Sequence, residues 1–509
     1  MFDKKLACSA QANFFDGLHC YVDAANGPLW SGFELGGIGL PGILVVLLLG
    51  VGLFFTAATG FVQLRLFGRS LKEMRSSRQN PNDPQAVTAF QAFVTGLASR
   101  VGTGNIAGVA IAITAGGPGA VFWMWLTAVI GMSSAFAESS LAQLFKVRDT
   151  ETGQFRGGPA YYIMRGLNQK WLAVLFSVSL ILCFGFVFNA IQSNTIVQSL
   201  QAAAGLNEKN GVSDGQWQIY THVFGAVLLI MTAPIIFGGI KRIARISEAV
   251  VPVMAAFYLL MALYVMVANI GELPRVFALI FQDAFTVQAA GGGLLGGMIS
   301  QAMMLGIKRG LFSNEAGMGS APNAAAAADV KHPVSQGMIQ MLGVFVDTVV
   351  VCSCTAFIVL LAKLPENADL SGIQLTQAAL ESHVGAWGQL FLAVVLFMFC
   401  YSSIIGNYAY AESNIQFLKN NRAVLTVFRM LVLAFVYFGA VAKVDLVWDM
   451  GDLSMGVMAL INLVAIALLY KWVLVLVKDY TVKLKLGKEP VFKLSEHPVL
   501  KRKIKSDIW

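Results

Sequence analysis

The sequence predicts an all-α, multi-pass membrane protein with eleven transmembrane helices, and three observations support this fold class. First, 57% of the 509 residues are hydrophobic and only 13% are charged, whereas soluble domains carry about a quarter charged residues. Second, the apolar residues gather in runs of roughly 20, the length that an α-helix needs to cross a bilayer. Third, basic residues collect in alternate connectors between these runs. A soluble fold of this length could not bury so much apolar surface.

The apolar runs divide into one leading helix, 38–64, and ten further helices that split five and five. We expect the first group of five within residues 88–270 and the second within 289–477. An extracytoplasmic segment of residues 1–37 precedes them, and a basic cytoplasmic tail of residues 478–509 follows. After the leading helix, the expected spans are 88–114, 119–145, 171–203, 217–237, 247–270, 289–307, 336–362, 385–412, 422–441 and 451–477.

The basic residues predict the orientation, because cytoplasmic loops near helix ends collect Lys and Arg. With the N-terminus outside and the C-terminus inside, alternate connectors hold most of them and the opposite connectors are nearly empty. The net charge of +8 then reflects the lipid surface of a bacterial inner membrane, and no nucleic-acid partner is expected. The residues placed inside are Arg65, Arg69, Lys72, Arg75, Arg78, Lys146, Arg148, Arg156, Arg165, Lys170, Lys241, Arg242, Arg245, Lys308, Arg309, Lys331, Lys419, Arg422 and the basic residues of 471–505.

A glycine-rich stretch interrupts the second expected span. Gly102 and Gly104 weaken the helix, and Asn105 offers a side-chain oxygen there. The carbonyls at the end of a half-helix can replace water around Na⁺, and the start of the next half-helix can accept a carboxylate. Alternatively, Gly104 and Gly108 have the spacing of a close helix-packing contact. Arg100 lies beside this break and is assigned to an inner gate.

A second interruption is expected where the seventh span closes, in the run from Gly306 through Gly310 to Gly317. An ordinary loop would also explain this run. However, transporters built from repeats carry a broken helix at corresponding places in both halves. Here each group of five spans begins with its glycine-interrupted helix. Because an odd number of spans inverts the second half, the sequence predicts two inverted five-helix repeats.

Several polar residues lie inside the expected spans, where an ionisable or amide side chain is costly and usually faces a cavity. Asn189 and Gln192 are three residues apart and share a helix face, so they either bind the polar end of a solute or hydrogen-bond between helices. Asp347, beside Thr348, is either a cation or proton ligand or part of a structural network. Glu138 is expected to end its helix near the cytoplasmic face as a structural partner.

Ser402 and Ser403 are adjacent hydroxyls of the kind that complete an oxygen cage for Na⁺, although serines in such helices also bond back to their own backbone. The five histidines occur singly and never at metal-ligand spacing, so solvated or capping roles are expected for them. We therefore expect no metal other than Na⁺ and no organic cofactor. Cys8 and Cys20 can pair outside the membrane, whereas the other four cysteines lie in apolar segments.

Three of these runs resemble the hallmark sequences of the sodium:alanine symporter family, also called alanine or glycine:cation symporters. The longest is Gly-Gly-Pro-Gly-Ala-Val-Phe-Trp-Met-Trp, residues 116–125, followed by Leu-Thr-Ala-Val-Ile-Gly. The others are Val-Gly-Thr-Gly-Asn-Ile-Ala-Gly-Val-Ala from Val101 and Lys-Arg-Gly-Leu-Phe-Ser-Asn-Glu-Ala-Gly from Lys308. The resemblance extends over residues 40–480. It implies a leucine-transporter-like fold that works by alternating access.

The resemblance also implies a binding site between the two broken helices. The amino acid would lie against the backbone of the first break, facing two amides on the fourth span and the glycines of the seventh. Sodium would be held nearby by carbonyls and serine hydroxyls. The implied substrate residues are Gly102, Thr103, Gly104, Asn189, Gln192, Gly306 and Gly310. The sodium-site residues are Ala98, Val101, Asn105, Ser402 and Ser403, with Arg100, Asp347 and Thr348 in gating or coupling.

Small hydroxyls and glycines around this site suit a small side chain, so alanine or glycine is the expected solute. A proton-coupled carrier and a solute channel are the alternatives. An enzyme is not expected, because the histidines, cysteines and carboxylates form no acid–base or metal constellation in the sequence. The expected partners are the amino acid, Na⁺ and membrane lipid, and no obligate protein partner is expected.

Overall fold

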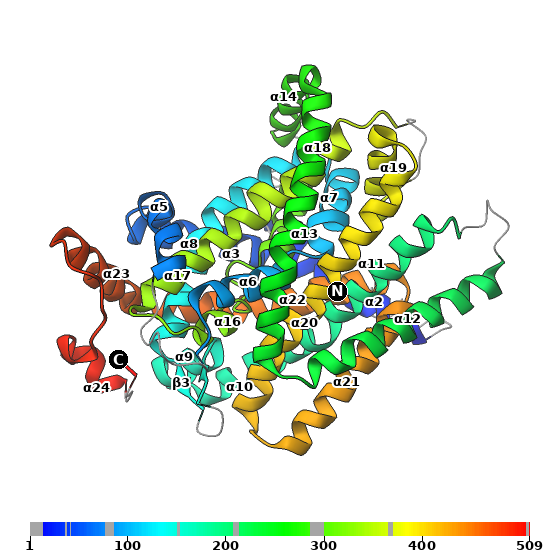
Figure 1. Cartoon of the computed structure of the whole chain (residues 1–509). Coiled ribbons are helices and arrows are strands. Elements are labelled where there is room, and N and C mark those ends of the chain that lie inside the picture. Colours follow the sequence, from blue (N-terminus) through cyan, green and yellow to red (C-terminus); the bar gives the residue numbers. More distant parts are fainter. Residues whose placement is uncertain are drawn as a thin grey trace.

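The computed structural model describes residues 14–35, 38–40, 42–76, 86–149, 153–206, 213–285, 300–364, 370–504 and 508–509. These residues are mostly helical (Figure 1). Within the described ranges the strands form two short antiparallel pairs. The strands are β1 (Phe33–Leu35) with β2 (Ile38–Leu40), and β3 (Val147–Arg148) with β4 (Phe155–Arg156).

Nine of the eleven predicted spans have a counterpart long and apolar enough to cross a membrane, within the part of the chain that the structure describes. Eight are single helices, and four of these contain a π-helical turn or an internal proline. The ninth is a pair, Ala89–Arg100 with Gly104–Gly116, bent by 53°. The eight are Ala120–Leu144, Lys170–Ala203, Gly215–Ile236, Arg242–Ala268, Pro333–Leu360, Trp387–Leu418, Arg422–Val441 and Val444–Leu468.

The leading helix is shorter than predicted. Residues 38–40 form β2 rather than helix, and α3 (Ile43–Ala58) has 16 residues. Gly60 and Phe61 then adopt positive φ values of 66° and 55°, which a right-handed helix does not allow, and the short helix α4 (Val62–Arg65) follows. The prediction of one continuous span over 38–64 is therefore wrong.

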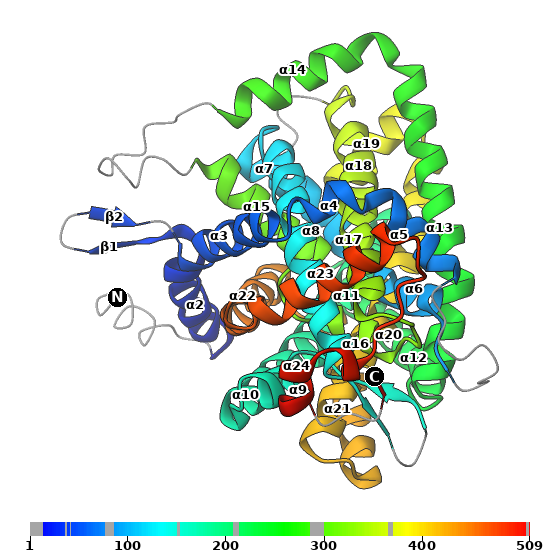
Figure 2. The ribbon, with the colours of Figure 1, turned by 90° about the vertical axis from the view of Figure 1, so that its left-hand side faces the viewer.

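The seventh predicted span, 289–307, lies largely in residues 286–299, outside the described ranges. The described helix α15 (Gln301–Asn314) continues beyond the predicted end. The eleventh, 451–477, is also misplaced, because α22 (Val444–Leu468) starts and ends earlier. The residues after it form a separate helix, α23 (Tyr470–Lys485), whose buried side packs against α8 and α17 (Figure 2).

The burial of the long helices divides them into an inner and an outer set. The span Pro333–Leu360 is 72% buried, whereas Gly215–Ile236 is only 22% buried. The outer helices α12 (Asp214–Ile236), α13 (Ile240–Ala268) and α21 (Arg422–Val441) expose many large apolar side chains, as a lipid-facing surface requires. The inner set is α6 (Ala89–Arg100), α8 (Ala120–Leu144), α11 (Phe188–Ala203), α15, α17 (Pro333–Val344), α20 (Trp387–Leu418) and α22.

Several helices outside the predicted spans were missed. The helix α2 (Phe14–Asn26) packs on α22, and α14 (Leu273–Ala284) lies at the top of Figures 1 and 2 beside α8. The helix α19 (Gly372–Val384) lies against α18 (Ser353–Leu360) and α20. These segments are short or have mixed polarity, so they do not resemble membrane spans in sequence. The remaining short helices outside the spans are α5 (Phe67–Ser76), α9 (Pro159–Gly166), α16 (Pro322–Ala327) and α24 (Pro498–Lys503), whereas α7 (Val109–Gly116) and α10 (Lys170–Leu180) belong to predicted spans.

The C-terminal segment folds back on the ends of α8 and α17 (Figure 2). Asp479 of α23 accepts hydrogen bonds from His332 Nε2 at 3.0 Å and Lys483 Nζ at 2.9 Å. Burial opposes its ionisation, but these two partners outweigh burial and lower the pKa of Asp479 to about 2. Burial lowers the pKa of His332, and its Nδ1 accepts from Val334 N at the start of α17. The predicted capping role of a histidine is thus confirmed here.

Candidate functional site

The predicted interruption of the second span is present. Thr88 and Gln91 form a capping box that starts α6, and this helix ends at Arg100. Val101 is extended, with ψ at 95°, and the chain resumes as a π-helical turn over Gly104–Gly108 that leads into α7. The break frees backbone carbonyls at the end of α6 and backbone amides ahead of α7.

Position 102 requires glycine because polar side chains of two other helices approach its backbone closely. A Cβ added to it would lie 2.4 Å from Ser403 Oγ and 2.7 Å from Gln192 Oε1. These are polar atoms of α20 and α11, so two further inner helices bring side chains directly onto the broken backbone. A Cβ on Gly104 would lie 2.9 Å from the ring of Phe312 in α15.

The second interruption lies further along the chain than predicted. Helix α15 runs without a break through Gly306 and Gly310, and a Cβ on Gly306 would meet Ala120 O of α8 at 2.4 Å. These glycines therefore provide close helix contact, and the prediction that they break the helix is wrong. The chain leaves the helix at Glu315, with φ at 58°, and residues 315–321 connect it to α16.

Glu138, in the last third of α8, holds this connection in place. Its carboxylate accepts from the backbone N–H groups of Gly317 and Gly319 at 3.3 and 3.0 Å. It also accepts from Asn462 Nδ2 at 2.7 Å. The predicted role as a structural partner is confirmed, but Glu138 does not end its helix, because α8 continues to Leu144. The sequence indicated a buried role for Glu138, because it is a single carboxylate within an apolar run.

Ser403 lies on the carbonyls at the end of α6. Its hydroxyl is 2.9 Å from Ala98 O, 3.2 Å from Val101 O and 3.0 Å from Phe399 O. Four oxygen atoms from two helices thus converge at one buried place. Ser402 shares only the Phe399 carbonyl, to which its hydroxyl donates at 2.9 Å; it faces Met254 Sδ of α13 at 3.7 Å and not the carbonyls at the end of α6.

Gln192 faces the break, and its Oε1 accepts from both Thr103 N and Thr103 Oγ1, at 2.9 and 2.8 Å. An amide oxygen thus occupies the anion-accepting end of the broken helix. Asn189, one turn earlier, is turned to α20 and accepts from Asn407 Nδ2 at 3.2 Å. The structure therefore brings Gln192 to the break and places Asn189 beside it in an interhelical hydrogen bond.

Asp347 joins the two interrupted helices. Its carboxylate accepts from Asn105 Nδ2 at 2.7 Å and from Ser313 Oγ, near the end of α15, at 2.7 Å. Thr348 Oγ1 also donates to it, at 2.8 Å. Asn105 is thus turned toward Asp347 and away from the Ser403 oxygens, while its Oδ1 accepts from Gly102 N at 2.9 Å. Asn105 therefore stabilises the break through its side chain in a different place from the one predicted.

Arg100 is 2% exposed, and its Nη1 lies 3.2 Å from Gln340 Oε1. This contact connects the end of α6 to α17. A Cβ on Gly343 would lie 2.2 Å from the same nitrogen, so α17 carries a glycine where the guanidinium passes. The arrangement ties Arg100 to the helix that leads to Asp347.

Lys308 and Arg309 do not lie in a cytoplasmic connector, as the charge count assumed. They belong to α15 and pair with the buried Asp452 of α22, with distances of 2.5 Å for Lys308 and 2.9 Å for Arg309. The Arg309 guanidinium also stacks over Trp448, 4.7 Å from the ring centroid. These cations are held inside the helix bundle because a carboxylate there balances them.

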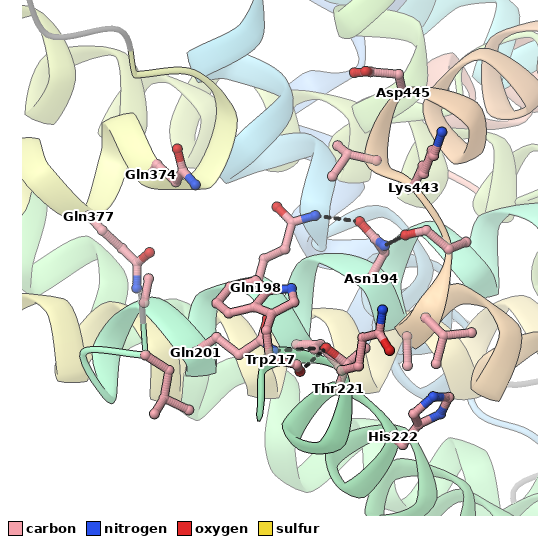
Figure 3. Close-up of a pocket in the computed structure, with 18 of the residues that line it drawn as sticks. Asn194, Gln198, Gln201, Trp217, Thr221, His222, Gln374, Gln377, Lys443 and Asp445 are labelled. Atoms are coloured by element: carbon pink, nitrogen blue, oxygen red, sulfur yellow. Dashed lines mark hydrogen bonds between the residues drawn. The ribbon is translucent and has the colours of Figure 1, made fainter. Parts of the chain in front are cut away.

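A cavity of about 1100 Å³ lies apart from these residues, where the end of α11 meets α12, α19 and the start of α22 (Figure 3). None of the predicted site residues lines it. Some of its amides are already engaged: Gln198 Nε2 donates to Asn194 Oδ1 at 2.6 Å, and Gln201 Nε2 donates to Thr221 Oγ1 at 2.9 Å. The lining carboxamides are Asn194, Gln198, Gln201, Gln218, Gln374, Gln377 and Gln389.

A multi-pass helical protein with a broken transmembrane helix, and with buried oxygens that converge on the break, is a membrane transporter. The chain matches the model of the sodium:alanine symporter family over residues 34–494. It belongs to that family, and it takes part in amino-acid transport by symport.

Three relatives show how far the similarity extends. An uncharacterized transporter of Haemophilus influenzae is 55% identical over 95% of both chains. A protein of Bacillus subtilis named probable sodium/glutamine symporter GlnT is 47% identical over 92% of both chains. The sodium/alanine symporter AgcS of Methanococcus maripaludis is 37% identical over 88% of this chain and 94% of its own. The similarity thus covers most of the length of each chain.

Proposed function

We propose that this protein carries a small neutral amino acid, alanine first and glycine next, into the cell together with Na⁺ by alternating access. The observation that carries the proposal is the meeting of Ser403 and Gln192 on the broken backbone of α6 and α7. One relative is named for alanine and another for glutamine, so the solute needs a direct test.

The proposed sodium site consists of the carbonyl oxygens of Ala98, Val101 and Phe399 with the hydroxyl of Ser403. All of these are oxygen donors, as a hard cation requires, and they are buried. Carbonyls at the end of a half-helix also favour a cation through the helix dipole. Ser402 is left out because its hydroxyl faces α13.

The proposed amino-acid site centres on Thr103. Gln192 Oε1, which now accepts from Thr103 N and Oγ1, stands where a substrate carboxylate oxygen would lie. A carboxylate is the stronger acceptor for these donors, so the solute would displace the amide oxygen. Gly102 leaves the room for this exchange, and Asp347 connects the site to α15 through Ser313. Gly306 and Gly310 are not included among the amino-acid ligands, because they face α8.

We propose the orientation that the sequence predicts, with the N-terminus outside the bacterial inner membrane. Cys20 of α2 is disulfide-bonded, and disulfides persist in oxidising compartments. The predicted partner Cys8 lies outside the described residues. His19 of the same helix contacts Asp449 at 2.7 Å, so the start of α22 lies on the same side. In this orientation the carboxamide-lined cavity opens on the extracytoplasmic side. We also propose that the two groups of five helices form the inverted repeats that the sequence predicts.

Calorimetric titration of the purified protein tests the solute and the ion. We expect alanine and glycine to bind in NaCl and to bind at least tenfold more weakly in KCl at the same pH. Glutamine, proline and leucine serve as competitors of increasing size or different chemistry. Tight glutamine binding without alanine binding would contradict the choice of solute, and equal alanine affinity in both salts would contradict the sodium link.

A further inference from the structure

A chain of hydrogen bonds runs through the bundle from Asn189, a predicted substrate ligand, to Glu315 in the second break. Asn189 Nδ2 donates to Gly185 O at 3.1 Å, and Asn189 Oδ1 accepts from Asn407 Nδ2 at 3.2 Å. Asn407 Oδ1 then faces Ser99 Oγ at 2.6 Å, and Ser99 Oγ faces Glu315 Oε1 at 2.8 Å. All these side chains are buried.

The Gly185 carbonyl, at one end of this series of hydrogen bonds, determines which group donates in each of the other bonds. The Gly185 carbonyl can only accept, so the amide nitrogen of Asn189 must point to it. Asn189 then presents its oxygen to Asn407, which must offer its nitrogen in return. Asn407 therefore presents its oxygen to Ser99, and the single hydroxyl proton of Ser99 is used in that contact.

The contact between Ser99 Oγ and Glu315 Oε1 still needs a proton. The other oxygen, Oε2, accepts from Ser320 Oγ at 2.6 Å, so the free proton belongs on Oε1. An ionised carboxylate would face a hydroxyl oxygen with no hydrogen between them, which is costly in a buried place. We infer that Glu315 is a proton-binding site, and that it holds the proton on Oε1 in this conformation.

The charged and titratable groups around Glu315 are Arg100 of α6, Asp347 of the segment after α17, Tyr410 of α20 and Cys183 before α11. Glu138 of α8 holds the backbone of the same break. Among the described residues Arg100 forms no ion pair with Glu315: the guanidinium hydrogen-bonds Gln340 through Nη1, and its Nε and Nη2 have no partner there. The proton on Glu315 thus removes one buried negative charge that lacks a direct ion pair.

The link to the solute rests on the proposed function. If the amino acid engages Asn189, the amide must change partners, and the change passes through Asn407 and Ser99 to Glu315. Binding of the solute and of this proton are then coupled, and the coupling is reciprocal. This site is separate from Asp347, whose carboxylate accepts three hydrogen bonds from side chains.

Infrared difference spectroscopy of the purified full-length protein tests the proton directly. The spectrum of the wild-type protein minus that of Glu315→Gln should show the carbonyl-stretch band of a protonated carboxylic acid. The Gln amide can donate to Ser99 and accept from Ser320, so the fold should be retained. Asp347→Asn is the control and should keep the Glu315 band. Bands of an ionised carboxylate in the same difference spectrum would overturn the inference.

Two further measurements use the same band. Ser99→Ala removes the acceptor of the proton, so the band should shift to higher wavenumber, and an unshifted band would contradict the assigned contact. Adding alanine to the wild-type protein should also shift it. A band that is present but insensitive to bound alanine would overturn the link to the solute while leaving the proton site. Failure of alanine to bind would instead count against the proposed function.

Discussion

The side-chain nitrogen of Asn105 lies 2.7 Å from a carboxylate oxygen of Asp347, and this contact joins the broken first helix to the second half of the chain. The same carboxylate accepts from Ser313, near the end of α15. A movement of either interrupted helix must therefore break or carry along a charge-assisted hydrogen bond. Such bonds contribute about 1.5–3 kcal/mol each, enough to couple the two halves.

We expect Asp347→Asn to lower sodium-driven uptake at least tenfold while the protein is still produced. The substituted amide keeps the size of the side chain but cannot accept from Asn105, Ser313 and Thr348 together. Asp445→Asn, at the rim of the carboxamide-lined cavity, is the matched control and should retain uptake. Equal uptake by both variants would remove Asp347 from the coupling.

Ser403 and Ser402 provide a matched pair for the sodium site. Ser403→Ala removes a hydroxyl that lies on three carbonyls, so the sodium concentration for half-maximal uptake should rise about tenfold, a loss of ~1.4 kcal/mol. Ser402→Ala should change it little, because that hydroxyl faces Met254. A larger rise of this sodium concentration in Ser402→Ala than in Ser403→Ala would contradict the proposed set of sodium ligands.

Gln192→Ala should weaken alanine binding more than it lowers protein yield, because Gln192 shapes the pocket at Thr103. Gln198→Ala on the same helix lines the separate cavity and serves as control. Titration calorimetry with alanine measures both. Unchanged alanine affinity in the Gln192 variant would reduce this amide to an interhelical contact.

Gly102→Ala should abolish uptake, since the added methyl would lie 2.4 Å from Ser403 Oγ and 2.7 Å from Gln192 Oε1. Gly50→Ala in α3 has nothing within 4 Å and should behave as wild type. Uptake of labelled alanine into proteoliposomes, corrected for the amount of reconstituted protein, compares them. A fully active Gly102 variant would mean that the break is not a close-packed site.

Asp479→Asn should lower the melting temperature by a few degrees at pH 7, because the folded protein depresses the pKa of Asp479 to about 2. The stabilisation is present above the unfolded pKa, near 4, and is lost as the pH falls through the folded value. The difference between variant and wild type should therefore shrink below pH ~4. A difference that grows on acidification would contradict the sign.

Much of the fold could be predicted because a bilayer imposes simple rules. Run lengths gave nine spans, and the glycines at Gly102 and Gly104 located the first break. The prediction of the leading span was wrong because Phe61 adopts a positive φ that its residue type does not predict, and because a single glycine, Gly60, does not by itself end an apolar run. The second break was misplaced because the glycines of α15 meet Ala120 of α8, a contact that depends on tertiary packing.

The site was predictable where residue type alone limits the chemistry. Ser403, Gln192, Asn105 and Asp347 were chosen as polar groups in apolar spans, and the structure places them at or beside the first break. Which of two adjacent serines faces the carbonyls depends on the rotation of α20, so Ser402 could not be separated from Ser403. The ion pairs of Lys308 and Arg309 were missed because their partner, Asp452, is distant in sequence.

Sodium-driven uptake tests the central claim most directly. Proteoliposomes that contain the purified protein are loaded with potassium buffer and diluted into buffer with labelled alanine and NaCl. We expect alanine to accumulate above its outside concentration, and we expect this accumulation to collapse when KCl replaces NaCl at the same pH. Accumulation that is unaffected by the replacement would contradict sodium coupling and with it the proposed role of Ser403 at the broken helix.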